Sequence, residues 1–432
     1  MTNDPFMTKW IDGNPFITLL EQMKLTESEL LGALEERDDA EEGFHLAPVA
    51  TKITGLSKRF YIPPPYCYEL YNHLYQMMLM GYLNRHPKTD DYDKYLHDID
   101  SGAKKIREIP KPPLVIDAGT MSLATGRSGN GKSTLFDKLL GCFELKNHFH
   151  TPCAETGGRR LPQVLWVKVG IKSTRSQRPF LLSIINAIDE QLGSNLASRF
   201  PSATVGDEIS YVIKMCRMVG LGLLVVDDVQ FLLNAKKTKG ANKLTNEFLE
   251  DLYNDLCVPM FLIGTPEVTD VFAEKGQLEQ TERRLISNGF FQIPDYAPDS
   301  VTWAELVKAS MLNFLCLKPD WLNEDVKQLI YYYCEGNIGK LKRLTGYLLK
   351  SQQKVKKENL PALLYEAHCG THIRGESIKP RMMLGGRGTS SQKEVKNEPI
   401  VETQEKQPEP IEPKVQARLD RIKAFEQQDM ED

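Results

Sequence analysis

The sequence has no long hydrophobic run. None of its 432 residues lies in a stretch near the eighteen or so apolar residues that a membrane-spanning helix needs. Residues 1–10 also lack the charged and then apolar pattern of a secretory signal. The formal net charge is only −4, so any contact with nucleic acid must come from local clusters of basic residues. These absences predict a cytoplasmic protein with no membrane partner.

The eight cysteines form no Cys-x-x-Cys pair. Scattered single cysteines are typical of reduced thiols that fill small spaces in a core, and they argue against a disulfide scaffold. Two short groups of His and Cys, at 148–153 and 368–372, contain metal-ligand types but lack a matching second half. We expect both groups to be ordinary loop residues.

One octapeptide, GRSGNGKS at 126–133, matches the phosphate-binding pattern G-x-x-x-x-G-K-[S/T] in full. It follows a short apolar run and leads into an amphipathic segment, which is the strand, loop and helix order of a P-loop. In such a loop, backbone N–H groups surround the β-phosphate, Lys132 contacts the β- and γ-phosphates, and Ser133 gives an oxygen to Mg²⁺. The predicted nucleotide-binding residues here are Gly126, Gly129, Asn130, Gly131, Lys132, Ser133 and Thr134.

A second motif, LLVVDD, follows at 223–228. Four apolar residues in a row suit the centre of a parallel sheet that is covered on both faces, and two carboxylates come directly after them. We interpret this segment as a Walker B strand, in which Asp227 joins Ser133 in holding Mg²⁺ and Asp228 positions the hydrolytic water. ATP and Mg²⁺ are therefore the expected cofactors.

Composition divides the chain into four regions. Residues 1–113 begin polar and acidic and then contain an aromatic-rich helix at 66–83, which we expect to pack on the main domain. Residues 114–298 alternate apolar runs with amphipathic stretches, which predicts an α/β domain with a parallel sheet. Residues 299–372 have helical periodicity and predict a small all-α lid. Residues 373–432 are rich in Lys, Glu, Gln, Pro and Gly, which predicts a disordered tail.

Individual elements can be placed within these regions. The expected strands of the α/β domain are 121–124, 163–169, 222–227, 258–264 and 289–293. The expected lid helices are 301–315, 323–335 and 338–350. In the tail, residues 415–425 have apolar residues at helical spacing, and this segment is either a partner-binding helix or a frayed end.

A P-loop α/β core with a helical lid resembles the plan of AAA+ ATPases, and the resemblance implies further site residues. The 258–264 strand is expected between the two Walker strands in space, with Thr265 at its end as the residue that senses the γ-phosphate. Arg283 or Arg284 is expected to reach the γ-phosphate of a neighbouring subunit as an arginine finger, which requires an oligomer.

Two positions depart from the usual AAA+ pattern. Asp228 stands where Glu is usual, and its shorter reach towards the water predicts slow ATP hydrolysis, because such geometry is sensitive to shifts of about an ångström. Gly339 stands in the sensor 2 segment GNIG (336–339) where an arginine is usual. Lys340 and Arg343 are the candidate substitutes, and each is equally well explained as a surface charge.

Several phrases resemble TnsC, the AAA+ regulator of bacterial cut-and-paste transposons that use target selectors. LGLLVVDDVQ at 221–230 and LIGTP at 262–266 are similar to its Walker B and sensor 1 segments. Further similar phrases are NPFI (14–17), IP (62–63), GY (81–82), NRHPKT (84–89) and LGSN (192–195). The resemblance implies a ring or filament on double-stranded DNA that couples a TniQ- or TnsD-like target selector to transposase subunits.

Two basic segments are candidates for sequence-independent phosphate contacts. The first surrounds the end of the second core strand and the start of the next helix, and the second follows the Walker B strand. The candidate DNA-binding residues are Lys168, Lys172, Arg175, Arg178, Lys236, Lys237 and Lys239. Solvated loops are the competing interpretation of both segments.

Three other functions remain open. A helicase loader or initiator of the AAA+ class would need a helicase-contacting segment, and none is recognisable. A scaffold that binds ATP without hydrolysing it is consistent with Asp228, and release of phosphate above background would exclude it. A small-molecule P-loop kinase would need a catalytic base and an acceptor pocket, and neither is visible in the sequence.

Overall fold

The computed structural model describes residues 13–35, 47–58, 61–83, 85–87, 94, 96–97, 121–143, 147–153, 156, 158, 160–171, 176–201, 204–231, 246–268 and 289–371. All of these residues belong to the first of two units of the chain, Met1–Gly375. The predicted tail at 373–432 lies outside them. Among the helices described, none combines the length and the apolar character needed to cross a membrane.

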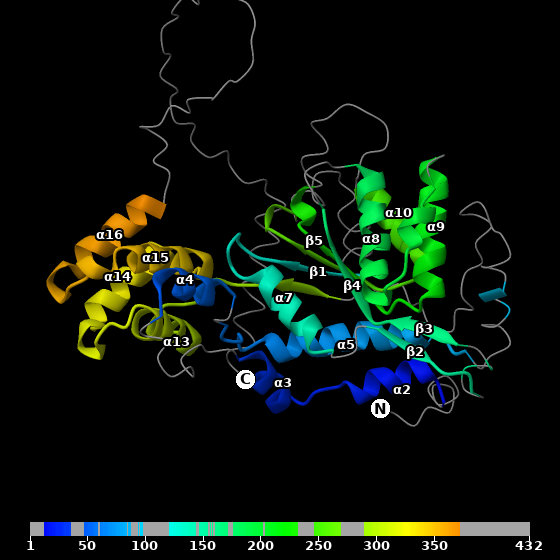
Figure 1. Ribbon diagram of the computed structural model, residues 1–432, viewed down its shortest axis with the longest axis horizontal. Helices are drawn as coiled ribbons and strands as arrows, with labels where there is room; N and C mark the ends of the chain where they lie inside the picture. Colours follow the sequence, from blue (N-terminus) through cyan, green and yellow to red (C-terminus); the bar gives the residue numbers. More distant parts are fainter. Residues whose placement is uncertain are drawn as a thin grey trace, which may run out of the picture. The chain divides into compact units, whose positions relative to one another are not determined.

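A five-stranded parallel sheet forms the centre of the α/β domain, in the order β4-β5-β6-β1-β7 (Figure 1). Every residue of the inner strands β1, β5 and β6 is buried, as expected where both faces of a parallel sheet are covered. The strands are β1 (Met121–Thr125), β4 (Trp166–Gly170), β5 (Leu223–Asp227), β6 (Met260–Gly264) and β7 (Phe290–Gln292). The predicted α/β class is confirmed, and β6 lies between β5 and β1 as expected.

The expected strand at 163–169 is wrong as a single element. Leu165 separates β3 (Leu161–Val164) from β4. β3 pairs antiparallel with β2 (Asn147–His150) in a separate two-stranded sheet, whereas β4 joins the main sheet. The apolar run conceals this break, because Leu165 and its neighbours Val164 and Trp166 are all buried.

The two His and Cys groups lie only partly on loops: Cys153 is in a bend as expected, the other described members are on regular elements, and His372 is outside the described residues. His150 is on β2, where its Nε2 lies 2.7 Å from the Oε1 of Gln163. His368 and Cys369 are within helix α16 (Leu360–Thr371). The described residues hold no group of three or more His, Cys, Asp or Glu side chains that could bind a metal ion.

Helices cover the sheet on both sides. α8 packs against β4 and α9, and α9 packs against α10 (Figure 1). α5 packs against β5 and α7. The bounds are α5 (Cys67–Leu83), α7 (Lys132–Gly141), α8 (Gln177–Leu192), α9 (Val205–Met218) and α10 (Asn246–Leu256), with a 3-10 turn η4 (Leu196–Arg199).

The N-terminal helices are divided between two hydrophobic cores. α2 (Pro15–Gln22) and α3 (Glu27–Leu34) share the core of the sheet with α5, most of which is buried, so the expected packing of the aromatic helix is confirmed. α4 (Val49–Lys58) instead packs against α15 and contributes Leu56 to the core of the lid.

The lid has its own core, formed by α4 and the helices that follow the sheet. α14 and α15 confirm the expected helices, and α15 buries Leu341, Leu344, Thr345, Leu348 and Leu349 at the spacing of one helix face. The expected helix at 301–315 begins as α13 and continues as a π-helical segment. The bounds are α13 (Val301–Lys308), η6 (Ala309–Phe314), η7 (Pro319–Trp321), α14 (Glu324–Cys334), α15 (Ile338–Lys350), η8 (Gln352–Lys354), η9 (Lys357–Asn359) and α16, which was not among the three expected helices.

A buried arginine ties the N-terminal region to the Walker B strand. The guanidinium of Arg85 donates to the backbone oxygens of Gly81 (2.8 Å) and Leu221 (2.6 Å), two residues before β5 begins. It also lies over the ring of Tyr82, whose hydroxyl donates to the Gly220 oxygen at 3.0 Å. Only 2% of Arg85 is exposed, so water cannot reach these carbonyls to donate the hydrogen bonds in its place.

We expect Arg85→Ala to lower the free energy of unfolding by about 3 kcal/mol, because it leaves a cavity and an unpaired buried carbonyl. Arg199→Ala, at an exposed position in η4, should change it by less than about 0.5 kcal/mol. Urea unfolding of both variants tests this, and equal midpoints would show that the hydrogen bonds of Arg85 contribute little to stability.

Candidate nucleotide-binding site

The P-loop joins β1 to α7 in the order predicted from the sequence. Gly129 and Gly131 have φ angles of 82° and 81°, in the left-handed region that favours glycine. Gly131 is also the N-cap of α7 and provides no side chain to bond the first-turn N–H groups. These N–H groups and the positive end of the helix dipole are therefore available to an anion.

Lys132 lies across this loop. Its Nζ donates to the backbone oxygens of Gly126 (2.5 Å) and Arg127 (2.9 Å), and the residue is 8% exposed. Burial lowers the pKa of its ammonium, while the nearby carboxylates of Asp227 and Asp228 oppose that shift. These carbonyl oxygens carry only partial negative charge, so a phosphate in the loop would bind the ammonium more strongly than they do.

The two Walker B carboxylates differ in exposure and in backbone geometry. Asp227 ends β5 and is buried, and its Oδ1 accepts a hydrogen bond of 2.9 Å from the backbone N–H of Asp228. Asp228 is exposed and has a φ of 61°, a left-handed conformation that aspartate tolerates at a cost. Gln230 donates to its Oδ1 at 2.8 Å. Asp228 is thus held at a sharp turn directly after the strand.

Most of the predicted nucleotide residues meet in one cavity of about 400 Å³. Ser133 and Asp227 both line it, so the hydroxyl and the carboxylate expected to hold Mg²⁺ face the same space. Thr265, at the end of β6, lines it as well. The full lining is Ser128, Gly129, Gly131, Lys132, Ser133, Thr134, Asp227, Asp228, Gln230, Gly264, Thr265, Ile338, Gly339 and Lys342.

Glu267, an exposed residue outside the cavity lining, interacts with Thr265 and Lys132 and was not among the predicted residues. A hydrogen bond from the Thr265 side chain lowers the pKa of the Glu267 carboxyl, and the charge of Lys132 lowers it further. Its position two residues after the predicted γ-phosphate sensor was the only available signal, and it is too weak to separate Glu267 from an ordinary surface glutamate.

Lys168, predicted to contact DNA, lies instead at the nucleotide site. Its Nζ is 2.7 Å from the Oδ1 of Asp137, 3.0 Å from the Oδ2 of Asp227 and 3.3 Å from the backbone oxygen of Ser133. With three oxygens around it and 15% of its side chain exposed, the ammonium has little freedom to reach a DNA phosphate. The side chain points from β4 towards α7, which the strand pattern alone does not specify, and its contact with DNA stays a prediction.

Arg178 is also engaged within the chain. Its guanidinium pairs with Glu208, donates to the Pro201 oxygen at 2.7 Å and lies over the ring of Phe200. The remaining predicted residues lie outside the described part of the chain. They are the DNA candidates Lys172, Arg175, Lys236, Lys237 and Lys239 and the arginine-finger candidates Arg283 and Arg284.

The first turn of lid helix α15 contacts the P-loop directly. The N–H of Gly339 donates to the Gly129 oxygen at 2.8 Å, and the Nδ2 of Asn337 donates to the Ser128 oxygen at 3.2 Å. Asn337 also caps α15 by accepting from the N–H of Lys340. A Cβ at position 339 would lie 2.9 Å from the Gly129 oxygen, so only glycine permits this approach.

The candidate substitutes for a sensor 2 arginine are engaged elsewhere. Lys340 pairs with Glu335 at 2.7 Å, and the Nε of Arg343 donates to the Gly339 oxygen of its own helix at 3.2 Å. Lys342 is the α15 cation that lines the phosphate cavity. No sequence pattern singles out Lys342, because the sensor 2 pattern points to position 339.

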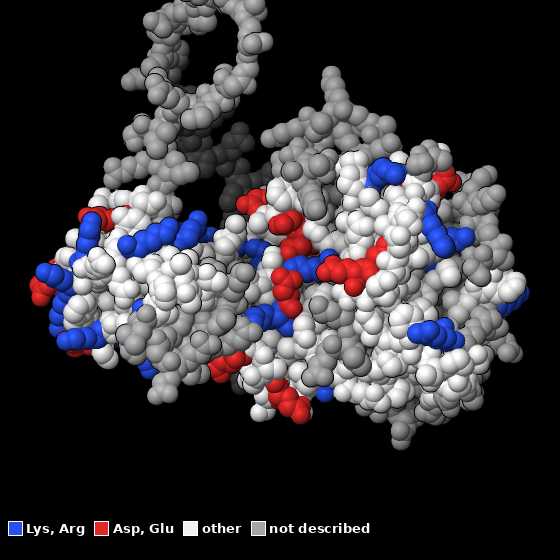
Figure 2. Space-filling model, in the orientation of Figure 1, with Lys and Arg blue, Asp and Glu red and all other residues white. Residues whose placement is uncertain are grey.

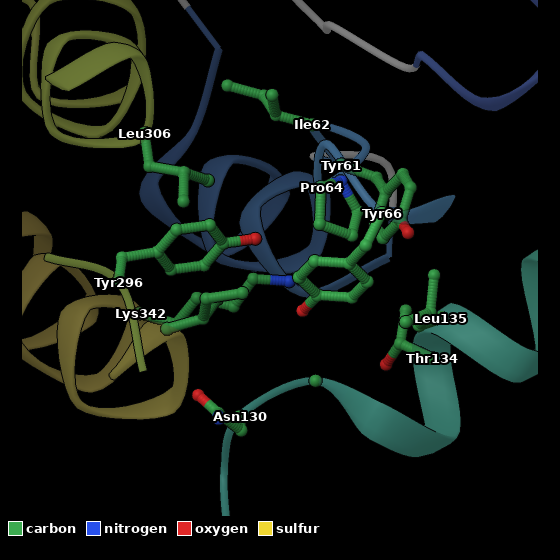
Figure 3. Close-up of a pocket in the computed structure, with 12 residues that line it drawn as sticks. Tyr61, Ile62, Pro64, Tyr66, Asn130, Thr134, Leu135, Tyr296, Leu306 and Lys342 are labelled. Atoms are coloured by element: carbon green, nitrogen blue, oxygen red, sulfur yellow. The ribbon is translucent and has the colours of Figure 1, made fainter. Parts of the chain in front are cut away.

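A second, smaller pocket adjoins the phosphate cavity. Figure 3 shows Lys342 reaching from α15 into this pocket between the rings of Tyr296 and Tyr66. Burial raises the pKa of Tyr296 to about 12, so its hydroxyl stays neutral. The lining residues are Tyr61, Ile62, Pro64, Tyr66, Asn130, Gly131, Thr134, Leu135, Tyr296, Leu306, Ile338 and Lys342. Aromatic and apolar walls beside a phosphate cradle suit a nucleotide base.

Asn130 gives this pocket a hydrogen-bond acceptor. Its Nδ2 donates to the backbone oxygens of Ile293 (3.1 Å) and Pro294 (2.8 Å), which fixes the orientation of the amide. Its Oδ1 is buried and has no partner. A donor group on a bound nucleotide would satisfy it. At about 40 Å³ the pocket must widen before it accepts a base.

Comparison with known proteins agrees with the fold and the P-loop. Residues 116–272 match the family model described as an AAA domain. The sequence matches no curated protein. The chain therefore contains an AAA+ P-loop domain that spans well under half of its length.

Two solved structures resemble the chain weakly. One is the Aeropyrum pernix ORC1 protein in complex with DNA, at 17% identity over 66% of this chain and 68% of that one, with a TM-score of 0.37. The other is the Walker-type ATPase PabY2304 of Pyrococcus abyssi, at 13% identity over 58% of this chain and 68% of that one, with a TM-score of 0.38. At these TM-scores neither likeness bears on function.

We expect Gly339→Ala to weaken ATP binding about tenfold, because the new Cβ separates α15 from the P-loop. Gly346→Ala, on the same helix with no atom within 4 Å of the new Cβ, should leave binding unchanged and stabilise the protein by about 0.5–1 kcal/mol. Calorimetric titration with ATP compares the two. Equal affinities would mean that the contact between lid and P-loop does not matter for the nucleotide.

Proposed function

We propose that this protein is a TnsC-like regulator that binds Mg-ATP, oligomerises on double-stranded DNA and couples a TniQ- or TnsD-like target selector to transposase subunits. In the chemistry proposed, Lys132 and the P-loop N–H groups bind the phosphates, and Asp227 and Ser133 hold Mg²⁺. Asp228 positions the water, Thr265 senses the γ-phosphate, and Arg283 or Arg284 acts from a neighbouring subunit. Mg²⁺ supplies charge neutralisation at the β- and γ-phosphates.

The observation that carries the DNA-binding part is the origin of the two predicted basic loops. The loop with Lys172 and Arg175 begins after β4, and the loop with Lys236, Lys237 and Lys239 begins soon after β5. β4 and β5 are paired in parallel, so the ends of the two strands that these segments follow in the sequence lie at the same edge of the sheet. Adjacent origins favour one shared phosphate-contacting surface over two unrelated solvated loops.

The charges on the visible surface are mixed in sign, so the proposed DNA contact depends on local segments. Figure 2 shows Lys and Arg side chains spread over the visible lid and mixed with Asp and Glu over the visible core. The residues drawn in colour on that face form no continuous basic stripe. In a ring or filament, the same loop would recur once per subunit, so individually weak contacts would add up.

The phrases that resemble TnsC also support the proposal by their placement. Asn14 starts α2 and donates to the Tyr82 oxygen at 3.2 Å, while Arg85 donates to Leu221 beside the Walker B strand. Phe16 stacks on Tyr82 with ring centroids 5.5 Å apart. Residues of separate N-terminal segments thus pack in one buried cluster next to the Walker B strand. This common packing gives a structural reason for the similar segments to occur together.

The first test is assembly on DNA. We expect electron microscopy of the purified protein on a random-sequence duplex to show rings or filaments with ATP or a slow analogue, and none with ADP. Lys132→Ala should abolish them, because the loop loses its charge on the phosphates. Asp228→Asn should retain ATP-dependent assembly while hydrolysis falls at least about a hundredfold.

The controls separate the competing functions. A protein that stays monomeric and does not bind DNA in any nucleotide state would contradict the proposed regulator function. This result would favour a kinase or a scaffold. Assembly on DNA together with capture of a replicative helicase, and without transposase or selector, would favour a loader. Phosphate release at background in the wild type would leave a non-hydrolysing ATP switch.

The second test removes the Walker B basic loop. We expect the triple variant Lys236→Ala, Lys237→Ala, Lys239→Ala to weaken DNA binding and to lower the slope of log affinity against log salt by up to about three per subunit. The matched control replaces three exposed lid lysines, Lys350, Lys354 and Lys356, with alanine. A larger loss in the control would move the DNA surface to the lid.

A further inference from the structure

The ammonium of Lys168 lies beside the groups that are expected to hold Mg²⁺. It contacts the Oδ2 of Asp227 at 3.0 Å and the backbone oxygen of Ser133 at 3.3 Å, which are the two residues assigned to the metal. The third contact, 2.7 Å to the Oδ1 of Asp137, is the shortest of the set. A positive charge of the chain itself therefore neutralises the Walker B carboxylate in this structure.

The surroundings of the three charges differ in a way that permits exchange. The Asp227 side chain is 11% exposed, whereas that of Asp137 is 62% exposed. An unpaired carboxylate is costly at the buried position and tolerable at the exposed one. Asp137 lies one turn beyond Ser133 on α7, so Lys168 can keep this partner while it gives up Asp227.

We propose that Lys168 is a tethered counter-ion that holds Asp227 in the metal-free site and retreats to Asp137 when Mg²⁺ enters. The inference rests on the proposed Mg-nucleotide site and deepens it. Lys168 must release the Oδ2 of Asp227 before that oxygen can join a metal shell, so loading of the site becomes an exchange of one cation for another. The residue thereby tunes how much Mg²⁺ the protein needs, and it is a positioning residue, because it acts through Asp227.

The exchange predicts opposite effects for its two partners. Lys168→Met removes the competing cation, so Mg²⁺ should bind more tightly, with a midpoint about tenfold lower. Asp137→Asn removes the place of retreat and leaves Lys168 on Asp227, so the midpoint should rise several-fold. Lys168→Arg keeps the charge and should stay near the wild type. A merely damaged site would weaken Mg²⁺ binding in every variant and cannot produce both signs.

The measurement is a titration of MgCl₂ against the full chain at a fixed concentration of a fluorescent, non-hydrolysable ATP analogue. Thermal unfolding with and without Mg²⁺ and nucleotide gives a second readout. We expect Lys168→Met to lower the melting temperature most in the metal-free protein, since Asp227 and Asp137 then lose the cation that they share, and least in the loaded one.

Each outcome is decisive. An unchanged or higher Mg²⁺ midpoint in Lys168→Met would overturn the exchange. Weaker DNA binding with a reduced salt slope, at an unshifted midpoint, would overturn it in favour of a DNA contact. If the wild type binds no nucleotide at any Mg²⁺ concentration, both the proposed nucleotide site and the proposed exchange are wrong. A wild type that binds nucleotide but fails to assemble on DNA would contradict the regulator and leave the exchange testable.

Discussion

The charge balance at the carboxyl end of β5 is the constraint on which the rest of the site depends. The four residues of β5 before Asp227 are all fully buried and apolar, and Asp227 itself is 8% exposed, so its charge needs a neighbour of opposite sign. Lys132 comes from α7 and Lys168 from β4 to do so. A parallel α/β sheet brings these charges together, because the carboxyl ends of its strands and the first turns of the following helices lie at one edge.

The two hydrophobic cores are joined by segments that run past the nucleotide site. α4 packs with the lid, whereas α2, α3 and α5 pack with the sheet, and residues 61–66 connect the two groups. Tyr61 and Tyr66 in this connection line the smaller pocket together with Lys342 of α15. A nucleotide base placed there would touch the core, the lid and the N-terminal connection at once. A rotation of the lid would therefore rearrange the N-terminal connection as well.

The sequence predicted those parts of the structure that are governed by local pattern. The apolar runs of β1, β5 and β6 and the bounds of α15 follow from burial periodicity and from the capping residue Asn337. The P-loop and Walker B residues followed from spacing, and most of them do share one cavity. That these residues bind Mg-ATP remains a prediction.

What failed depends on tertiary partners. The break at Leu165 is invisible in an apolar run, because both sides are buried against different sheets. Membership of α4 in the lid depends on its contact with α15, far away in the chain. The contacts of Lys168 could not be predicted, because a strand pattern does not say which helix its side chains face. Asp137, its nearest partner, carried no signal at all.

The contact between lid and P-loop explains why Gly339 stands where an arginine is usual. The ion pairs of Arg127 with Asp295 and Glu335 also cross this boundary, but Arg127 is half exposed, and such pairs contribute at most about 1 kcal/mol each. The hydrogen bond from Gly339 to the Gly129 oxygen is packed so closely that a side chain would break it. An arginine at this position would sense phosphate charge, whereas a glycine makes the lid follow the backbone of the P-loop itself. The position of the lid is then tied to the shape of the loop, and a nucleotide bound in the cavity would place its charge beside Lys342, one turn further along α15.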